Sequence, residues 1–151
     1  MIYYLNENVD ESHITFSSSF KNVKNITDSL NKKELSNICS GEFKNSPFVV
    51  YRKVALVDNN PASFIDVYSI PSEMEKNEAV IVCATKKEYR GLGLIKKCYN
   101  GLESIVKKKG IDTLYWETTK NNSASSSIAK SLGFSKGKDI NKDDDNYVKH
   151  I

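Results

Sequence analysis

The residues with the clearest chemical potential lie in one short segment in the second half of the chain. A polar turn there carries Arg90 and two glycines, Gly91 and Gly93, and it follows the apolar run Ala79–Ala84. Apolar residues at helical spacing follow the second glycine. Glycines let a backbone approach a ligand closely, and the free N–H groups and dipole of a helix start favour phosphate oxygens. This order predicts a diphosphate-binding loop, and the alternative is a pair of glycines that only turns a strand into a helix.

Two familiar phosphate-binding motifs do not describe this segment. A dinucleotide fingerprint needs a third glycine three residues after the second one, and that position holds Lys96. The pattern GxxxxGK[ST] does not occur in the chain. The loop is therefore of another type.

The segment Val82–Ile95 resembles the coenzyme A motif of GNAT acetyltransferases, whose core is Gln/Arg-x-x-Gly-x-Gly/Ala. Arg90 and Gly93 match that core, and Ile95 stands where the family has Gly or Ala. Downstream, Asn122 followed by the Leu-Gly-Phe of residues 132–134 is similar to the closing helix of the family. The resemblance extends from about Phe48 to Phe134 and contains two motifs in the expected order.

The resemblance implies acetyl-CoA or coenzyme A as the bound cofactor, with acetyl-CoA as the acyl donor. Its pyrophosphate would bind the backbone amides of the glycine loop, and its pantetheine arm would pair with the end of the preceding strand. The asparagine would contact that arm or order the loop. The larger side chain of Ile95 narrows the space beside the pyrophosphate, but only its backbone amide is needed. The cofactor-binding residues implied in this way are Cys83, Ala84, Thr85, Arg90, Gly91, Leu92, Gly93, Leu94, Ile95 and Asn122.

Acetyl transfer to an amine needs a neutral nucleophile, donors for the developing oxyanion and a proton for the departing thiolate. The resemblance implies direct attack in a ternary complex, with no covalent cysteine or serine. Glu117 is the first candidate for the base, because it precedes Asn122 by five residues, where ribosomal-protein N-terminal acetyltransferases carry a glutamate. Glu78, at the start of the central strand, is the second candidate. Either glutamate could instead be a surface or ion-paired residue.

The family's usual proton donor is missing. A tyrosine normally stands four residues before the glycine of Leu-Gly-Phe, and that position is Ala129 here. Ser126, Ser127 or Tyr147 could replace it, as could water, or the thiolate could leave without help. The first hypothesis is an N-acetyltransferase acting on a primary amine of a small molecule, a lysine side chain or a protein N-terminus. The alternative is a catalytically weak acyl-CoA-binding or regulatory module.

The pattern of the whole chain predicts one α/β domain over residues 1–151, with the GNAT fold: a mixed, mostly antiparallel sheet of about six to seven strands flanked by about four helices. The apolar run before the glycine loop should be the central strand. Strands are expected at 2–5, 14–16, 48–57, 62–70, 79–84, 111–119 and 146–151, helices within 23–38, 94–106 and 122–132, a helix stop at Gly41, and turns at 58–61 and 143–145.

The composition of the chain limits the kinds of binding partner that are expected. A net charge of +3 gives no concentrated basic surface, and the lysines at 96–97 and 107–109 lie mostly on the polar side of one helix, so a nucleic-acid partner is not expected. No secretion signal or long apolar run is recognisable, which predicts a cytoplasmic protein without a membrane partner.

Three widely spaced cysteines and two histidines predict neither a disulfide framework nor a metal site. Cys83 and Cys98 are expected to be buried thiols. The amine acceptor should be selected by Asn22–Phe43 and the Ile70–Asn77 loop, and its identity and the oligomeric state, a homodimer included, are left open.

Overall fold

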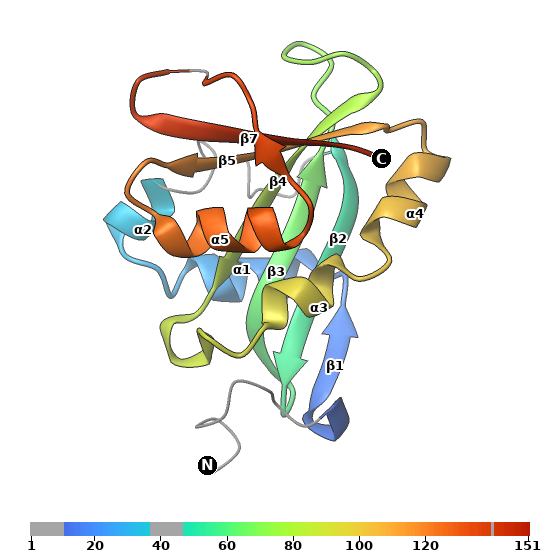
Figure 1. Cartoon of the computed structure of the whole chain (residues 1–151). Helices are drawn as coiled ribbons and strands as arrows, with labels where there is room; N and C mark the ends of the chain where they lie inside the picture. The colour runs from blue at the N-terminus through green and yellow to red at the C-terminus, as the bar shows by residue number, and fades with distance from the viewer. Residues whose placement is uncertain (1–10, 37–46, 140) are drawn as a thin grey trace.

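The computed structural model describes residues 11–36, 47–139 and 141–151. One seven-stranded sheet, in the order β1-β2-β3-β4-β5-β7-β6, runs through these residues (Figure 1). Its strands are β1 (Ile14–Ser17), β2 (Val49–Val57), β3 (Asn60–Tyr68), β4 (Glu78–Thr85), β5 (Thr113–Thr119), β6 (Ser135–Lys136) and β7 (Asp144–His150). The predicted strand before the glycine loop, β4, is the middle one, as its continuous apolar run indicates.

The middle of the sheet contains its only parallel pair among the described strands. β4 and β5 pair in parallel from Glu78 opposite Thr113 to Ile81 opposite Trp116, and every other neighbouring pair is antiparallel. Both strands continue beyond this last paired position, β4 to Thr85 and β5 to Thr119. Because no β4–β5 pairing covers these continuations, the sheet parts at Ile81 and Trp116.

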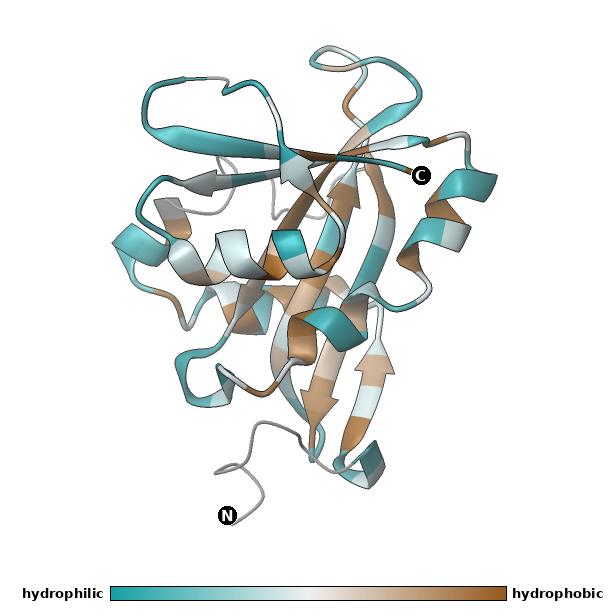
Figure 2. Ribbon diagram, in the orientation of Figure 1, coloured by the Kyte–Doolittle hydropathy of each residue, from teal (hydrophilic) through white to brown (hydrophobic). Residues whose placement is uncertain are grey.

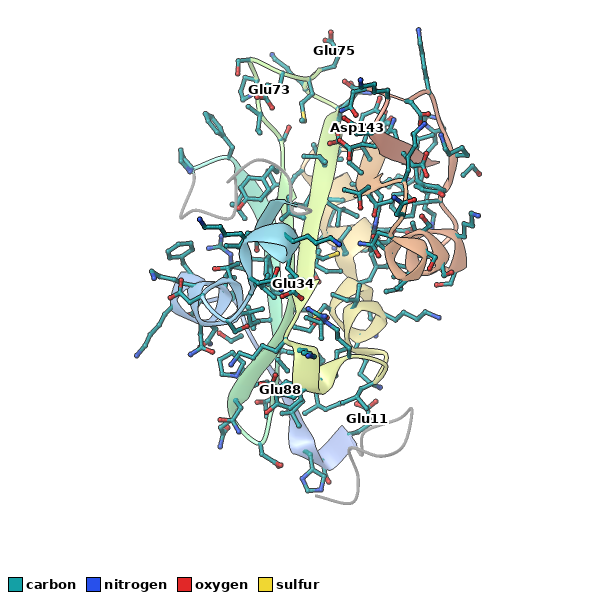
Figure 3. All side chains as sticks on the ribbon, turned by 90° about the vertical axis from the view of Figure 1, so that its left-hand side faces the viewer. Glu11, Glu34, Glu73, Glu75, Glu88 and Asp143 are labelled. Atoms are coloured by element: carbon teal, nitrogen blue, oxygen red, sulfur yellow. The ribbon has the colours of Figure 1, made fainter. Side chains whose placement is uncertain are left out.

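Helices cover both faces of the sheet. The described α-helices are α1 (Phe20–Thr27), α2 (Lys32–Ser36), α3 (Leu94–Tyr99), α4 (Leu102–Lys108) and α5 (Ser123–Ser131). In Figure 3, α1 lies on one side of the sheet, and α3 and α5 lie on the other. The longest of these helices has nine residues, and none has the length and apolar content needed to cross a membrane.

Each face of the sheet has its own hydrophobic core. On the α1 face, Val23 and Ile26 pack with Phe64 and Tyr68 of β3. Figure 2 shows the hydrophobic colours concentrated on the central strands and on the inward sides of the helices. On the opposite face, the core includes the alternate β3 residues together with helix residues such as Leu102. The alternation of side chains along a strand explains this division.

The hairpin between β2 and β3 confirms the predicted turn at 58–61. Asp58 and Asn59 have φ of 49° and 66° and form a two-residue connection. Positive φ at both central positions matches the right-handed twist of a hairpin, and Asn and Asp tolerate it best after glycine. Residues 60 and 61 already belong to β3.

The helix expected after Gly93 is interrupted, which corrects the prediction of one continuous helix. α3 ends at Tyr99, and α4 begins after Gly101, whose φ is 85°. A left-handed residue cannot continue a right-handed helix, so the chain turns there. The expected stop at Gly110 is confirmed, with φ of 91° directly after the last helical turn.

Two further expectations need correction or fall outside the described chain. The predicted turn at 143–145 is partly strand, because β7 begins at Asp144 and its residues pair with β5 up to Thr119. The predicted strand at 2–5 and the helix stop at Gly41 lie outside the described residues. The fold class itself is confirmed: a mixed, mostly antiparallel sheet with helices on both faces.

Candidate active site

A cavity of about 940 Å³ opens where β4 and β5 part. The ends of both strands, the glycine loop, the start of α5 and residues of α2 surround it. Residues that line it include Leu30, Lys33, Glu34, Val82, Cys83, Ala84, Thr85, Arg90, Gly91, Leu92, Gly93, Leu94, Ile95, Trp116, Glu117, Thr119, Asn122, Ser125, Ile128 and Asp143. All ten residues predicted to bind the cofactor are among them.

The glycine loop faces this cavity with its backbone. Gly91 and Gly93 have φ of 82° and 73°, and a Cβ atom on either would meet no atom within 4 Å. Gly93 is the N-cap residue of α3 and has no side chain to cap the helix. The first amides of α3 have no intrahelical acceptor, so they are available to oxygen atoms in the cavity. The loop therefore combines open space with backbone donors.

Arg90 connects this loop to the opposite side of the cavity. Its Nε donates to the carbonyl of Thr85 at 3.1 Å, and its guanidinium donates to Glu34 of α2. Glu34 also accepts from the amide of Asn31, while the Asn31 side chain accepts from the amide of Glu34, which is a capping box. The hydrogen bond from Arg90 is the largest of the contacts that lower the pKa of Glu34. Figure 3 shows Glu34 in front of β4, toward the end of the strand that leads to the glycine loop.

The two candidate bases lie at opposite ends of the strands. Glu117 follows Trp116, the last residue of β5 that pairs with β4, and it lines the cavity. Glu78 begins β4, three residues before the parting point, and is not among the described residues that line the cavity. It accepts a hydrogen bond from the hydroxyl of Tyr115, which lowers the pKa of Glu78.

The start of α5 forms the other wall. The side chain of Asn122 caps the helix by accepting from the amide of Ser125 at 3.2 Å. The hydroxyl of Ser125 accepts from the indole Nε1 of Trp116 at 3.0 Å. Both Asn122 and Ser125 line the cavity. The asparagine thus caps the start of α5, which is neither of the two roles that the resemblance implied.

The suggested replacements for the missing tyrosine lie elsewhere. Ser126 and Ser127 are not among the described cavity-lining residues, and Ser127 is exposed. Tyr147 is buried on β7, with Lys130 over its ring at 6.0 Å. Ala129, the position of the missing tyrosine, is fully buried.

The two described cysteines are poor nucleophiles. Burial raises the pKa of Cys83 and of Cys98 to about 12, so both remain thiols at neutral pH. Cys98 is buried as expected, whereas Cys83 is only partly so and lines the cavity. Within the described ranges, no three His, Cys, Asp or Glu residues are grouped to hold a metal ion.

Sequence reasoning missed three of the cavity-lining residues. The capping pattern Asn-x-x-Glu marks the start of α2 but does not reveal that Glu34 meets Arg90. Ser125 could have been found as the third residue after a helix cap, but not as a partner of Trp116. Asp143 stands beside β7, and only the sheet order brings it to the cavity.

A sheet that parts beside a glycine loop and a helix start defines an acyl-CoA-binding class of fold, and comparisons with known proteins agree. The family described as "Acetyltransferase (GNAT) family" matches residues 16–134. The chain therefore belongs to the GNAT acetyltransferase family, whose acyl donor is acetyl-CoA. A search of curated proteins found no match.

Solved structures share this fold at low sequence identity. The GNAT domain of S. lividans PAT has a TM-score of 0.74 at 8% identity, covering 91% of this chain and 89% of that chain. The PaiA N-acetyltransferase from Thermoplasma acidophilum, solved in complex with coenzyme A, has a TM-score of 0.70 at 20% identity, covering 91% and 99%. The ribosomal-protein-S18-alanine N-acetyltransferase from Escherichia coli has a TM-score of 0.63 at 17% identity, covering 89% and 90%.

Proposed function

We propose that this protein is an N-acetyltransferase that transfers the acetyl group of acetyl-CoA to a primary amine by direct attack. The observation that carries the proposal is one continuous cavity, lined both by the glycine loop and by Glu117. A cofactor bound to the glycine loop and an amine in contact with the carboxylate of Glu117 would therefore lie in the same cavity. The acceptor is a small molecule, a lysine side chain or a protein N-terminus.

The residues present fit acetyl-CoA. The positive-φ glycines leave the loop open where a Cβ would otherwise project, and the amides at the start of α3 can donate to a diphosphate. The end of β4 from Cys83 to Thr85 pairs with β3 on one edge but has no β5 partner on the other, so the backbone groups on that open edge are available to an extended arm. When bound, acetyl-CoA supplies an activated acetyl group at the parting point of the strands.

Glu117 is the proposed base. It lies one residue beyond the last β4–β5 pair, on the strand face opposite that of Trp116. That face is the α1 side, where Leu30, Lys33 and Glu34 also line the cavity. An amine entering there would lose its proton to the carboxylate of Glu117, directly or through water. The raised pKa of Cys83 argues against a covalent thiol intermediate at neutral pH.

The first test is calorimetric titration of acetyl-CoA, and separately of coenzyme A, into the wild type and a Gly93→Glu variant. The variant places bulk and negative charge in the loop, so it should lose binding, while circular dichroism checks its folding. A folded wild type that binds neither ligand would overturn the proposal.

Wild-type binding would then justify an amine screen that follows thiol release. Glu117→Gln should lower kcat by about 100-fold or more with acetyl-CoA affinity unchanged. Glu78→Gln is the matched control and should leave both values near those of the wild type, because Glu78 lies outside the cavity lining. Saturable binding without turnover of any amine would instead favour the acyl-CoA-binding module.

A further inference from the structure

We propose that Ser125 is a catalytic residue that donates a hydrogen bond to the coenzyme A sulfur as the acetyl group leaves. The inference rests on the proposed function. Among the hydroxyl groups that line the described cavity, that of Ser125 is the one bonded to the side chain at the parting point of the sheet.

The hydroxyl of Ser125 receives a hydrogen bond from a buried side chain. Trp116 is almost fully buried, and its indole Nε1 donates to Ser125 Oγ at 3.0 Å. An indole nitrogen is only a donor, so this bond uses an acceptor position of the serine oxygen and leaves its hydrogen to donate elsewhere. Because Ser125 lines the cavity, the cavity provides a direction in which that hydrogen can point.

The glycine loop and the parting point lie a short distance apart along β4. The loop that would bind the diphosphate follows the end of β4 at Thr85, and the parting point lies at Ile81. Four residues of extended strand span about 13 Å. An extended arm of about that length, starting at the loop and following β4, would end near Ile81 and Trp116. Its terminal sulfur would lie beside Ser125.

The proposed base and the Ser125 hydroxyl belong to opposite faces of the sheet. Trp116 belongs to the core on the α3 and α5 face, whereas Glu117, the next residue, points to the α1 face. The base and the hydroxyl thus approach the parting point from opposite faces. An acetyl carbon held between them would have the amine and Glu117 on one side, and the sulfur and Ser125 on the other.

With this arrangement, every bond, electron pair and proton in the acetyl transfer is accounted for. The amine nitrogen forms the new C–N bond, and the C–S electron pair goes to sulfur as that bond breaks. The proton lost by nitrogen passes to Glu117, and the sulfur leaves as a thiolate that Ser125 stabilises and solvent later protonates. Serine keeps its own proton, so no further reactant is needed. Ala129, one turn further along α5, is fully buried and supplies no polar group.

The test compares Ser125→Ala, which removes the donor, with Ser125→Thr, which keeps a hydroxyl. Ser131→Ala is the matched control, because it removes another α5 hydroxyl that bonds only the carbonyl of Ile128 and lies away from the cavity. Loss of a hydrogen bond to a developing charge should lower kcat by roughly 10- to 100-fold in Ser125→Ala. Ser125→Thr and Ser131→Ala should remain within about threefold of the wild type on the same grounds.

A second readout needs no turnover. The thiolate of bound coenzyme A absorbs ultraviolet light, so its apparent pKa can be titrated on each variant within the pH range of the folded protein. Ser125→Ala should raise that pKa by about 1, because the donor that favours the thiolate is lost. The Ser125→Ala variant should also bind coenzyme A and a desulfo analogue with equal affinity. The wild type should bind coenzyme A more tightly than the desulfo analogue at pH values above the thiol pKa of its own coenzyme A complex.

The outcomes separate the two proposals. Removing Ser125 also leaves the indole N–H of Trp116 without its partner, so urea unfolding is measured alongside, and a purely structural effect would lower stability without moving the thiol pKa. A wild type that turns over, together with a Ser125→Ala variant of unchanged kcat and thiol pKa, would overturn the role of Ser125 alone. A wild type that does not bind coenzyme A would overturn both proposals.

Discussion

One buried ion pair shows how much a single side chain can matter in this fold. Arg52 of β2 donates twice to Asp66 of β3, with both Nε···Oδ1 and Nη2···Oδ2 at 2.8 Å, and the hydroxyl of Tyr68 donates to the same carboxylate at 3.1 Å. Asp66 is fully buried, and the guanidinium lies 5.3 Å from the ring centre of Phe20 on α1. Each charge has left water and depends on the other.

Asp66→Ala should therefore lower the free energy of unfolding by about 3 kcal/mol, because it leaves Arg52 buried without a counter-charge. Urea unfolding followed by circular dichroism measures the change. The control is Asp28→Ala, which breaks the exposed pair between Asp28 and Lys24 and should cost less than about 0.5 kcal/mol. Equal losses in the two variants would show that the buried pair has no special weight.

Among the elements, α5 connects the stability of the fold to the site. Its first turn supplies Asn122 and Ser125 to the cavity. Its last turn ends in a Schellman motif, in which the amides of Phe134 and Gly133 bond the carbonyls of Ala129 and Lys130 at 3.0 Å. Both ends of the helix are thus closed by local hydrogen bonds. The cap residue is also the asparagine that the resemblance associates with the cofactor.

Substitution of Asn122 can separate these two roles. Asn122→Asp keeps a side-chain oxygen for the amide of Ser125, so the unfolding free energy should change little, whereas Asn122→Ala should lose about 1 kcal/mol. If the amide of Asn122 also donates to acetyl-CoA, Asn122→Asp should weaken binding about tenfold, since it removes the donor and adds negative charge. Calorimetry measures the affinity for acetyl-CoA, and thermal unfolding measures the change in stability. Unchanged affinity in Asn122→Asp would assign Asn122 to capping alone.

At the scale of the whole molecule, side-chain contacts join the last strand, β7, to α4 and to the end of α5. Lys149 of β7 donates to Glu103 of α4 and, at 2.8 Å, to the carbonyl of Leu132 after α5. Tyr99 of α3 also donates to Glu103. Desolvation alone would raise the pKa of Glu103, but the hydrogen bonds from Lys149 and Tyr99 outweigh it, and the pKa is lowered. A carboxylate with a lowered folded pKa stabilises the protein above its unfolded pKa, and this contribution is lost as the pH falls through the folded value.

Glu103→Gln should therefore destabilise the protein by about 1 kcal/mol at pH 7, a modest value because both charged groups are partly exposed. The difference from the wild type should shrink as the pH falls below the unfolded pKa of Glu103 and then through its lowered folded pKa, because the carboxyl is then protonated in both states. Urea unfolding across this range measures it. A constant difference would indicate that Glu103 acts by packing and not by charge.

Local signals in the sequence were sufficient to predict several strands and turns and the glycine loop. The alternation or continuity of apolar residues identified β2 to β5, and the positive-φ turn at Asp58 and Asn59 was readable from residue type. The glycines before Leu94 and the cap at Asn122 were readable in the same way. These features depend on residues close together in the chain, because the conformational freedom of glycine and the capping ability of asparagine are local properties.

The register between β2 and β3 could not be predicted from such local signals. β2 and β3 pair Leu56 with Pro61 and then Ala55 with Ser63, so Ala62 is an extra residue. This shift places Arg52 opposite Asp66, where an unshifted hairpin would have placed it opposite Ile65. Nothing in the pattern of either strand marks the bulge. The continuous pattern after Gly93 similarly hid the break at Gly101, because both short helices bury the same side.

The chain's own sequence thus determined the GNAT loop, the order of most of its strands and helices, and Glu117 as the candidate base. Tertiary structure alone decided that β4 and β5 separate after Ile81 and Trp116, that Arg90 meets Glu34, and that Ser125 receives the indole of Trp116. The physical reason is that periodicity reports which side of an element is buried, whereas the partner on that side is chosen by contacts between residues far apart in the chain.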